Sequence, residues 1–250
     1  MEEKMDLLLK NGLVVTENEC KRGDIAVKNG KIAGLLERGS KTCCSEKEID
    51  CQGKVILPGA IDTHSHFFEP GEPSKYRDDF YTATMAAAAG GYTTCIEMPQ
   101  SIPPVVNKEA FLLKKKLATE KAVVDFALWG GLVPSSLDKI KELKEEGCVA
   151  FKAFTSDAGP DYEMCSDYDL LEGMKIVKAV GGLVGIHAEN DSICRKMTEY
   201  YRGMKTICPE YHEASRPWYA ELEAVSRCIL WSRITECPVM ICHLSIPEGA

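Results

Sequence analysis

From residue 55 onward, short apolar runs alternate six times with longer segments of helical pattern. The apolar runs predict strands at about 55–61, 93–97, 123–129, 149–154, 183–187 and 239–243. The intervening segments predict helices at roughly 78–89, 107–119, 136–146, 167–180, 190–202 and 217–236. Because the runs are apolar throughout, the strands suit burial on both faces of a parallel sheet. The chain is therefore expected to form an α/β fold, either an open doubly wound sheet or a (β/α)8 TIM-type barrel.

The N-terminal part of the chain has a different, all-β pattern. Between residues 5 and 56, short apolar runs are separated by turn residues rather than by helical segments. Asn29-Gly30 predicts a tight hairpin because both residues tolerate positive φ, and Asn11-Gly12 is expected to separate two further runs. We therefore expect two domains, a β domain at 1–54 and the α/β domain at 55–250.

Charge and cysteine usage exclude several classes of protein. A net charge of −8 and a pI near 5.3 argue against nucleic acid or an anionic membrane as partner. The only dense basic run, Lys114-Lys115-Lys116, is expected on an exposed helix face. No stretch approaches the roughly 20 apolar residues that span a bilayer, and the acidic start lacks a signal peptide's apolar segment. The 12 cysteines include no Cys-x-x-Cys pair, so they are expected to be reduced thiols of a cytoplasmic protein.

Histidines are concentrated at the ends of the predicted strands. His64 and His66 flank one serine after the first apolar run, and alternate residues of a strand face the same side. His187 ends the fifth strand and His243 the sixth, whereas His212 matches no strand end and is expected at the surface. Each histidine alone is more often structural than a ligand. Barrel enzymes build their active sites at the C-terminal ends of strands, so the four together predict a site for zinc, iron or nickel.

Lys152 lies inside the fourth apolar run, 149–154. An ammonium group is costly to bury there, so its pKa is expected to fall and the neutral amine to become accessible. A neutral amine beside metal ions can add carbon dioxide, and the resulting carbamate can bridge two cations. The alternative is a lysine with a buried stem whose head pairs with a carboxylate. The sequence leaves both possibilities open.

Several motifs, in order and at the right spacing, resemble the cyclic amidohydrolases of the amidohydrolase superfamily. They are Asp62-Thr-His-Ser-His66, Glu69-Pro-Gly71, Gly90-Gly-Tyr-Thr-Thr94, Met98-Pro99, Phe151-Lys-Ala-Phe154, His187-Ala-Glu-Asn190, Ser215-Arg-Pro217 and His243-Leu-Ser-Ile-Pro-Glu-Gly249. The resemblance covers nearly the whole chain. It implies a metal-bearing barrel beside a small β-sandwich, which residues 1–54 begin, and a homotetramer for the full-length protein.

The resemblance also implies a role for each residue of the site. His64 and His66 would bind the more buried of two divalent metal ions, with zinc expected, and His187 and His243 the more exposed one. Lys152, carboxylated on its side-chain nitrogen, would bridge the two metals. The metals would acidify a shared water, and the hydroxide would attack a ring carbonyl.

The family's catalytic aspartate follows its eighth strand, and no residue of this chain fills that role. The resemblance therefore places the aspartate beyond Ala250 and implies a barrel truncated after the sixth strand. We expect residues 1–250 alone to be inactive and prone to aggregate, because an unclosed barrel leaves strand edges unpaired.

Differences between this chain and the motifs of related amidohydrolases indicate the substrate class. Dihydroorotases carry an arginine and an asparagine where this chain has Phe68 and Gln100, and a phenylalanine cannot pair with a substrate carboxylate. Taken together, the motifs Ile96-Glu-Met-Pro99, Phe151-Lys-Ala-Phe154 and His187-Ala-Glu-Asn190 most resemble those of the allantoinases, which open the hydantoin ring of allantoin to allantoate. A small cyclic ureide is therefore the expected ligand. Hydantoinase or dihydropyrimidinase activity is the alternative, and a non-catalytic scaffold of the same fold is a second.

Overall fold

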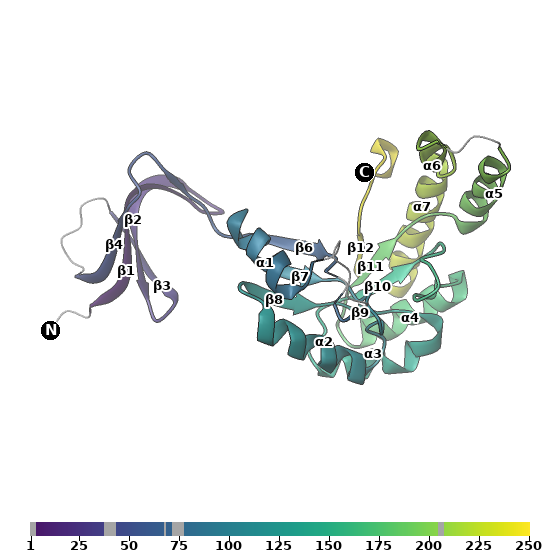
Figure 1. Ribbon diagram of the computed structural model, residues 1–250, viewed down its shortest axis with the longest axis horizontal. Coiled ribbons are helices and arrows are strands. Elements are labelled where there is room, and N and C mark those ends of the chain that lie inside the picture. The colour runs from purple at the N-terminus through teal and green to yellow at the C-terminus, as the bar shows by residue number, and fades with distance from the viewer. Residues whose placement is uncertain (1–3, 38–43, 68, 72–77, 205–207) are drawn as a thin grey trace. The chain divides into compact units, whose positions relative to one another are not determined.

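The computed structural model describes residues 4–37, 44–67, 69–71, 78–204 and 208–250. The chain separates into two compact units, Met1–Ala60 and Ile61–Ala250 (Figure 1). The sequence placed this boundary after residue 54. It lies further along the chain because β5 (Val55–Ile56) pairs with β1 (Met5–Val15) and so belongs to the N-terminal unit.

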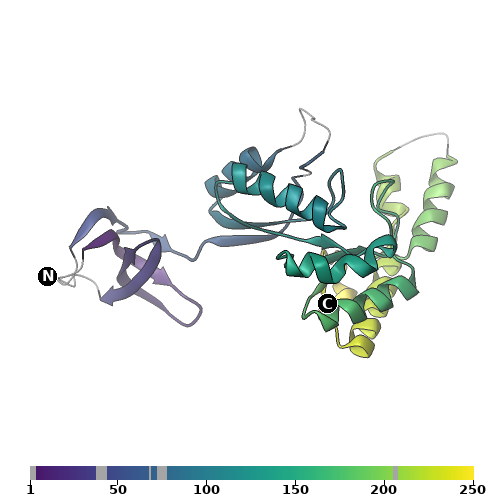
Figure 2. The same cartoon turned by 90° about the horizontal axis from the view of Figure 1, so that it is seen from below.

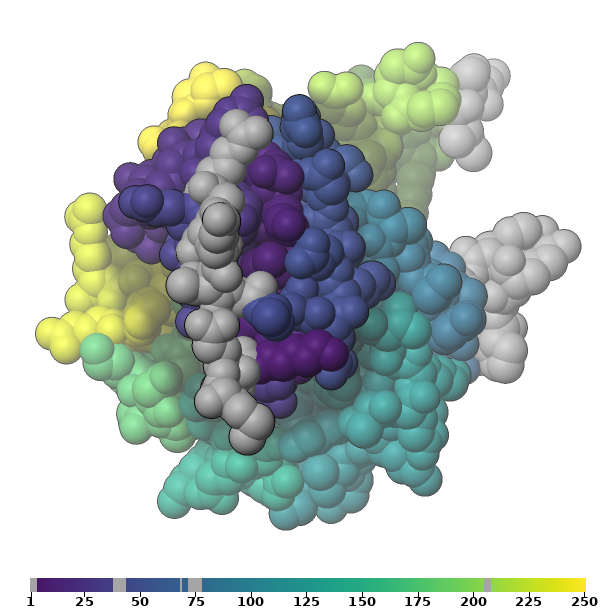
Figure 3. All heavy atoms as spheres, turned by 90° about the vertical axis from the view of Figure 1, so that its left-hand side faces the viewer, coloured from purple at the N-terminus to yellow at the C-terminus, as the bar shows by residue number. Residues whose placement is uncertain are grey.

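The N-terminal unit contains one five-stranded sheet, whose surface is drawn in purple and dark blue in Figure 3. The strands β2 (Cys20–Lys28) and β3 (Lys31–Glu37) follow β1 in antiparallel pairs. On the other edge of β1, β4 (Ser45–Asp50) and β5 pair with it in parallel. Asn29 and Gly30 have φ values of 51° and 70°, so the hairpin predicted between β2 and β3 is confirmed.

The turn expected at Asn11-Gly12 is wrong, because β1 runs through it as one strand of 11 residues. The pairing of β1 with β2 shifts register between Leu9 and Gly12, which marks a β-bulge. Asn11 takes a φ of 62° there. Its backbone N–H donates to Asp24 Oδ1 at 2.7 Å and its side-chain amide to Asp50 Oδ1 at 3.0 Å. These contacts come from other strands, so the local pattern could not reveal them.

The C-terminal unit is built on parallel strands that follow one another in chain order. They are β6 (Ala60–Ser65), β7 (Tyr92–Glu97), β8 (Asp125–Leu128), β9 (Gly130–Gly131), β10 (Phe151–Phe154), β11 (Val184–His187) and β12 (Val239–Ile241). They form the orders β6-β7-β8 and β12-β11-β10-β9. The two sheets join at Trp129, whose backbone N–H donates to Glu97 O at 3.0 Å, and at Val149 N–H, which donates to Leu128 O at 3.1 Å.

The first predicted strand of this unit, at 55–61, is wrong in position. β6 begins only at Ala60, because Val55 and Ile56 pair with β1. Pro58 and Gly59 then separate β5 from β6. The other five predicted strands overlap observed ones. As a result His64 lies within β6 and His66 follows its end directly.

Helices connect these strands. They are α1 (Phe80–Ala89), α2 (Lys108–Lys121), α3 (Ile140–Glu145), α4 (Asp167–Ala179), α5 (Asp191–Arg202), α6 (Glu210–Ala214) and α7 (Trp218–Thr235), with 3-10 turns η1 (Pro134–Lys139) and η2 (Pro247–Gly249). Side chains of Asp79, Asn107, Ser166 and Asn190 cap α1, α2, α4 and α5. The short α6 was missed, and the helix predicted at 136–146 is divided between η1 and α3. No helix of the described residues is long and apolar enough to cross a membrane.

The main core lies between the strands and these helices. Figures 1 and 2 show α2, α3 and α4 side by side along one flank of the strands. Phe111, Leu143, Phe151 and Met174 are fully or almost fully buried in this layer. The unit is thus a mixed α/β fold, as expected. The cysteines among the described residues, which exclude Cys43, are free thiols.

Candidate functional site

The structure brings together four histidines that are far apart in the sequence. The ring centroids of His64 and His66 are 5.0 Å apart, those of His64 and His243 5.8 Å, and those of His187 and His243 4.6 Å. The contact of His64 Nδ1 with Cys242 O, at 3.3 Å, joins the end of β6 to the end of β12. The first and the last strand of the series thus approach each other at the site. His212 is exposed on α6, as expected.

Within this group the imidazole nitrogens approach each other in two pairs. His64 Nε2 lies 3.0 Å from His66 Nε2, and His187 Nδ1 lies 3.0 Å from His243 Nε2. Two nitrogen ligands of one tetrahedral zinc ion, each about 2.0–2.1 Å from it, lie roughly 3.3 Å apart. Each pair thus has nearly the spacing that a shared metal ion requires.

Burial favours the neutral, metal-binding form of three of these imidazoles, those of His64, His66 and His243. Burial, together with the nearby His64 and Lys152, lowers the pKa of the His66 imidazole from 6.5 to about 4. Burial also lowers the pKa of His64 and of His243, with Lys152 contributing to both. Because a metal ligand must carry an unprotonated ring nitrogen, these shifts favour ligand behaviour at neutral pH.

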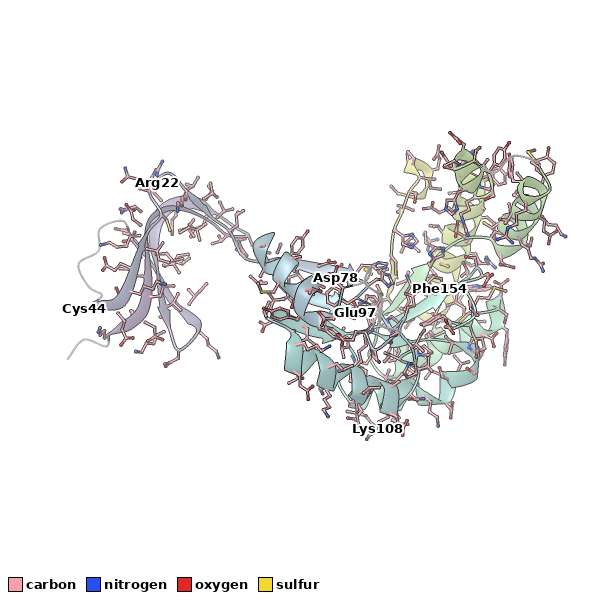
Figure 4. All side chains as sticks on the ribbon, viewed as in Figure 1. Arg22, Cys44, Asp78, Glu97, Lys108 and Phe154 are labelled. Atoms are coloured by element: carbon pink, nitrogen blue, oxygen red, sulfur yellow. The ribbon has the colours of Figure 1, made fainter. Side chains whose placement is uncertain are left out.

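Lys152 is buried in β10, with an exposed fraction of 1%. Its Nζ lies over the Phe154 ring, 4.8 Å from the centroid, and burial lowers the pKa of its amine. In the part of the chain that the structure describes, no carboxylate forms an ion pair with Lys152, so the alternative of a paired ammonium group finds no partner there. Figure 4 shows Phe154 at the end of β10, and this ring also stacks on His187 at 4.9 Å.

Glycines flank Lys152 in both neighbouring strands. Its register partners are Gly131 in β9 and Gly185 in β11. A Cβ atom at Gly185 would lie 2.6 Å from the Trp129 ring, which is closer than real Cβ contacts. The Trp129 indole N–H donates to Thr63 O of β6 at 3.3 Å. The indole is thus tied to the strand that carries His64.

Among residues 4–37, 44–67, 69–71, 78–204 and 208–250, no group of three His, Cys, Asp or Glu side chains is arranged to hold a metal. The histidine nitrogens contact each other in two pairs, and the Lys152 amine is near enough to act electrostatically on His64, His66 and His243. The set fits metal ions only if Lys152 supplies an anionic donor to both pairs.

Glu189 is a site residue, although its place just before α5 is more typical of a helix cap. Its Oε2 lies 2.6 Å from His187 Nε2 and accepts from Arg216 Nη1 at 2.7 Å. Burial alone raises the pKa of Glu189, but the hydrogen bond from His187 and the charge of Arg216 bring it down to about 2. Asn190 caps α5 instead, accepting from Ile193 N–H at 3.2 Å. The two-residue spacing from His187 was the available signal, since it is the spacing at which side chains share a strand face.

One pocket adjoins these residues, and a second is lined by residues that follow β7 and β10. One, of about 350 Å³, is lined by His187, Glu189, His212, Arg216 and His243 with neighbours. Another, of about 230 Å³, is lined in part by Gln100, Asp161 and Tyr162. Phe68, the residue that argues against a dihydroorotase in the sequence, lies outside the described residues. The first pocket is of the size that admits a small ring next to the more exposed histidine pair.

Residues 55–228 match the amidohydrolase family. The chain belongs to this family. The matched range includes β6, β7, β8, β10 and β11, and with them His64, His66, Lys152 and His187. The family assignment and the clustered side chains thus rest on the same segment of the amidohydrolase chain.

Two allantoinases are among the relatives that the chain matches. The amidohydrolase chain is 37% identical to an allantoinase of Escherichia coli O9:H4 (strain HS), over 98% of its own length and 54% of the relative's. It is 41% identical to an allantoinase of Rubrobacter xylanophilus, over 98% and 53%. It is therefore an allantoinase homologue that spans about half the length of these relatives.

Solved structures agree at the level of fold. The L-hydantoinase (dihydropyrimidinase) from Arthrobacter aurescens superposes with a TM-score of 0.91 at 33% identity, covering 98% of this chain and 54% of that one. A D-hydantoinase superposes with a TM-score of 0.87 at 31% identity, covering 98% and 53%. The chain thus has the fold of the matching half of these hydantoinases.

Proposed function

We propose that this chain holds two zinc ions and takes part in hydrolysing allantoin to allantoate. The residues that would hold the metals are His64, His66, Lys152, His187 and His243. The observation that carries the proposal is the pair of 3.0 Å nitrogen contacts, His64–His66 and His187–His243, with buried Lys152 close to both pairs. Zinc bound there supplies an acidified water and an electrophile for the ring carbonyl.

The chain's own residues prepare the site for that chemistry. Burial lowers the pKa of the Lys152 amine and so favours its neutral form, which suits it to carry a carboxylate group shared by both histidine pairs. Glu189 fixes the His187 ring by accepting from Nε2, which leaves Nδ1 directed at His243. The pocket beside His187 would hold the ring substrate, with the Arg216 guanidinium on its wall.

The same proposal includes the architecture around the site. We take the strands β6 to β12 as part of a (β/α)8 barrel and the N-terminal sheet as part of a β-sandwich. The contact of His64 with Cys242 O supports a closed arrangement, and the TM-score of 0.91 to a hydantoinase supports both domains. A homotetramer of the complete protein belongs to the proposal as well.

Allantoin is preferred over other cyclic amides because the allantoinases among the relatives are 37% and 41% identical over nearly the whole chain. Hydantoin or dihydrouracil is the second candidate, favoured by the close superposition on an L-hydantoinase. All three compounds carry a ring amide that the same reaction would hydrolyse. Hydantoin lacks the ureido substituent of allantoin, and dihydrouracil has a six-membered ring.

The deciding experiment assays the complete gene product against allantoin, hydantoin and dihydrouracil side by side, with zinc measured by elemental analysis. We expect about two zinc ions per chain and a value of kcat/KM for allantoin at least about tenfold above the others. Two zinc ions with a preference for hydantoin or dihydrouracil would replace allantoin by the second candidate. A protein that binds no zinc and turns over none of the three would be a scaffold, and the proposal would be wrong.

Glu189 offers a test of the histidine geometry. Replacing it by alanine is expected to weaken zinc binding by about 10–100-fold, because the His187 ring loses the acceptor that orients it. Glu189→Gln keeps an acceptor oxygen and is expected to retain most of the affinity. Competition with a chelator measures both, with Glu199→Gln on the exposed face of α5 as the control. Equal zinc affinities of the alanine variant and the unmodified protein would contradict this role.

A further inference from the structure

Glu97 and Lys114 form an ion pair from which solvent is fully excluded. Both side chains have an exposed fraction of 0%, and Lys114 Nζ lies 3.1 Å from Glu97 Oε1. The sequence placed Lys114 on an exposed helix face, which is wrong. Figure 4 shows Glu97 at the end of β7, within the C-terminal unit.

A contribution to the stability of the fold does not explain why the chain contains a buried ion pair of this kind. Taking two charges out of water costs several kcal/mol per ion, and apolar replacements of similar volume are often neutral or stabilising. Burial lowers the pKa of the Lys114 amine even though Glu97 opposes the shift, which shows how strongly the site disfavours charge. The arrangement therefore needs another reason.

Further contacts of the pair connect it to the backbone around His66. Both oxygens of Glu97 accept from the backbone N–H of Phe67, at 2.9 and 3.0 Å, and Phe67 directly follows His66. Lys114 donates to Met98 O at 2.6 Å, while Met98 N–H donates to Ser65 O at 2.9 Å. The peptide groups on either side of His66 are thus fixed from β7 and its following residue, with α2 holding them in place.

We propose that the buried Glu97–Lys114 pair is a positioning device that sets the backbone of His66 and thereby aims the His64–His66 pair at its metal. Glu97 acts through the Phe67 N–H, and Lys114 compensates the carboxylate charge and anchors Met98. This inference rests on the proposed metal function for its purpose. The positioning of the rings can be measured without a metal.

The experiment compares two double variants of the full chain. In Glu97→Gln with Lys114→Met, an uncharged acceptor for Phe67 N–H remains. In Glu97→Met with Lys114→Met, the charges are removed equally but no acceptor remains. Zinc titration is expected to show at least about tenfold weaker binding at one of two sites for the second variant and a change under about threefold for the first. Lys108→Met with Glu146→Gln, an ion pair between the start of α2 and the end of α3, is the control pair.

Ring signals in nuclear magnetic resonance spectra report on positioning without zinc. In Glu97→Met with Lys114→Met, the signals of His64 and His66 are expected to shift or broaden, while that of His212 stays unchanged. Unchanged His64 and His66 signals would overturn the proposal, and so would equal zinc affinities of the two double variants. If the unmodified protein binds no zinc, the proposed function fails and the ring signals alone decide the positioning role.

The Phe67 amide proton gives a readout that needs no variant and so does not depend on any variant folding. Bonded to a fully buried carboxylate, it is expected to exchange with solvent at least about a hundredfold more slowly than an open loop amide. Exchange at the rate of an open loop would show that the carboxylate does not hold this peptide, and the proposal would be wrong.

Discussion

Replacing Lys152 by methionine is expected to lower allantoin turnover of the complete protein by about a thousandfold or more, because the variant loses the donor that we propose both histidine pairs share. Methionine has nearly the length of lysine and is apolar, so a position exposed by only 1% can accept it without a cavity. Zinc content, measured by elemental analysis, is expected to fall from about two ions per chain to one or fewer.

The control for this experiment is Lys175→Met. Lys175 is exposed on α4 and pairs with Glu172 at 2.6 Å, so its loss is expected to leave turnover and zinc content unchanged. If the Lys152 variant kept two zinc ions and more than about a tenth of the turnover, the lysine would have a structural role only.

Replacing Phe151 by alanine is expected to lower the free energy of unfolding by about 3–5 kcal/mol. Phe151 is fully buried in the main core and precedes Lys152 on the opposite face of β10. The variant loses the contacts of a whole ring and leaves a cavity that the packed strands cannot close. Equilibrium unfolding in urea measures the change, followed by far-UV circular dichroism.

Tyr168→Ala supplies the matched control. Tyr168 is 71% exposed on α4, so its truncation is expected to change the free energy of unfolding by less than about 0.5 kcal/mol. A loss below about 1 kcal/mol for the Phe151 variant would mean that β10 is not packed as the structure has it.

The order of strands and helices and the meeting of the four histidines could be anticipated from the sequence for a common reason. In a parallel sheet built from successive strand-helix units, residues that end different strands lie at the same edge. His187 and His243 needed only this rule and their positions after apolar runs. Their role as zinc ligands remains a proposal.

Other features could not be predicted from the sequence because the residues that they contact are distant along the chain. Lys114 is buried only because Glu97 of another element meets it, so a run of three lysines looked like a solvated helix face. Glu189 contacts Arg216, which lies beyond α6, and without that partner its place before α5 suggested a cap. The start of β6 was misplaced because Val55 and Ile56 are taken up by pairing with β1. Each of these predictions was wrong because an interaction between elements outweighed the local sequence preference.

Gly185, the register partner of Lys152, is intolerant to substitution for a steric reason and has no chemical role of its own. Every other amino acid would drive its first side-chain carbon into the Trp129 ring, at the point where the two sheets join. An inherited or engineered change at this position would therefore lower the yield of folded protein before it altered catalysis. A survey that ranks positions by loss of function would place Gly185 with the proposed zinc ligands, although it would contribute no atom to the proposed reaction.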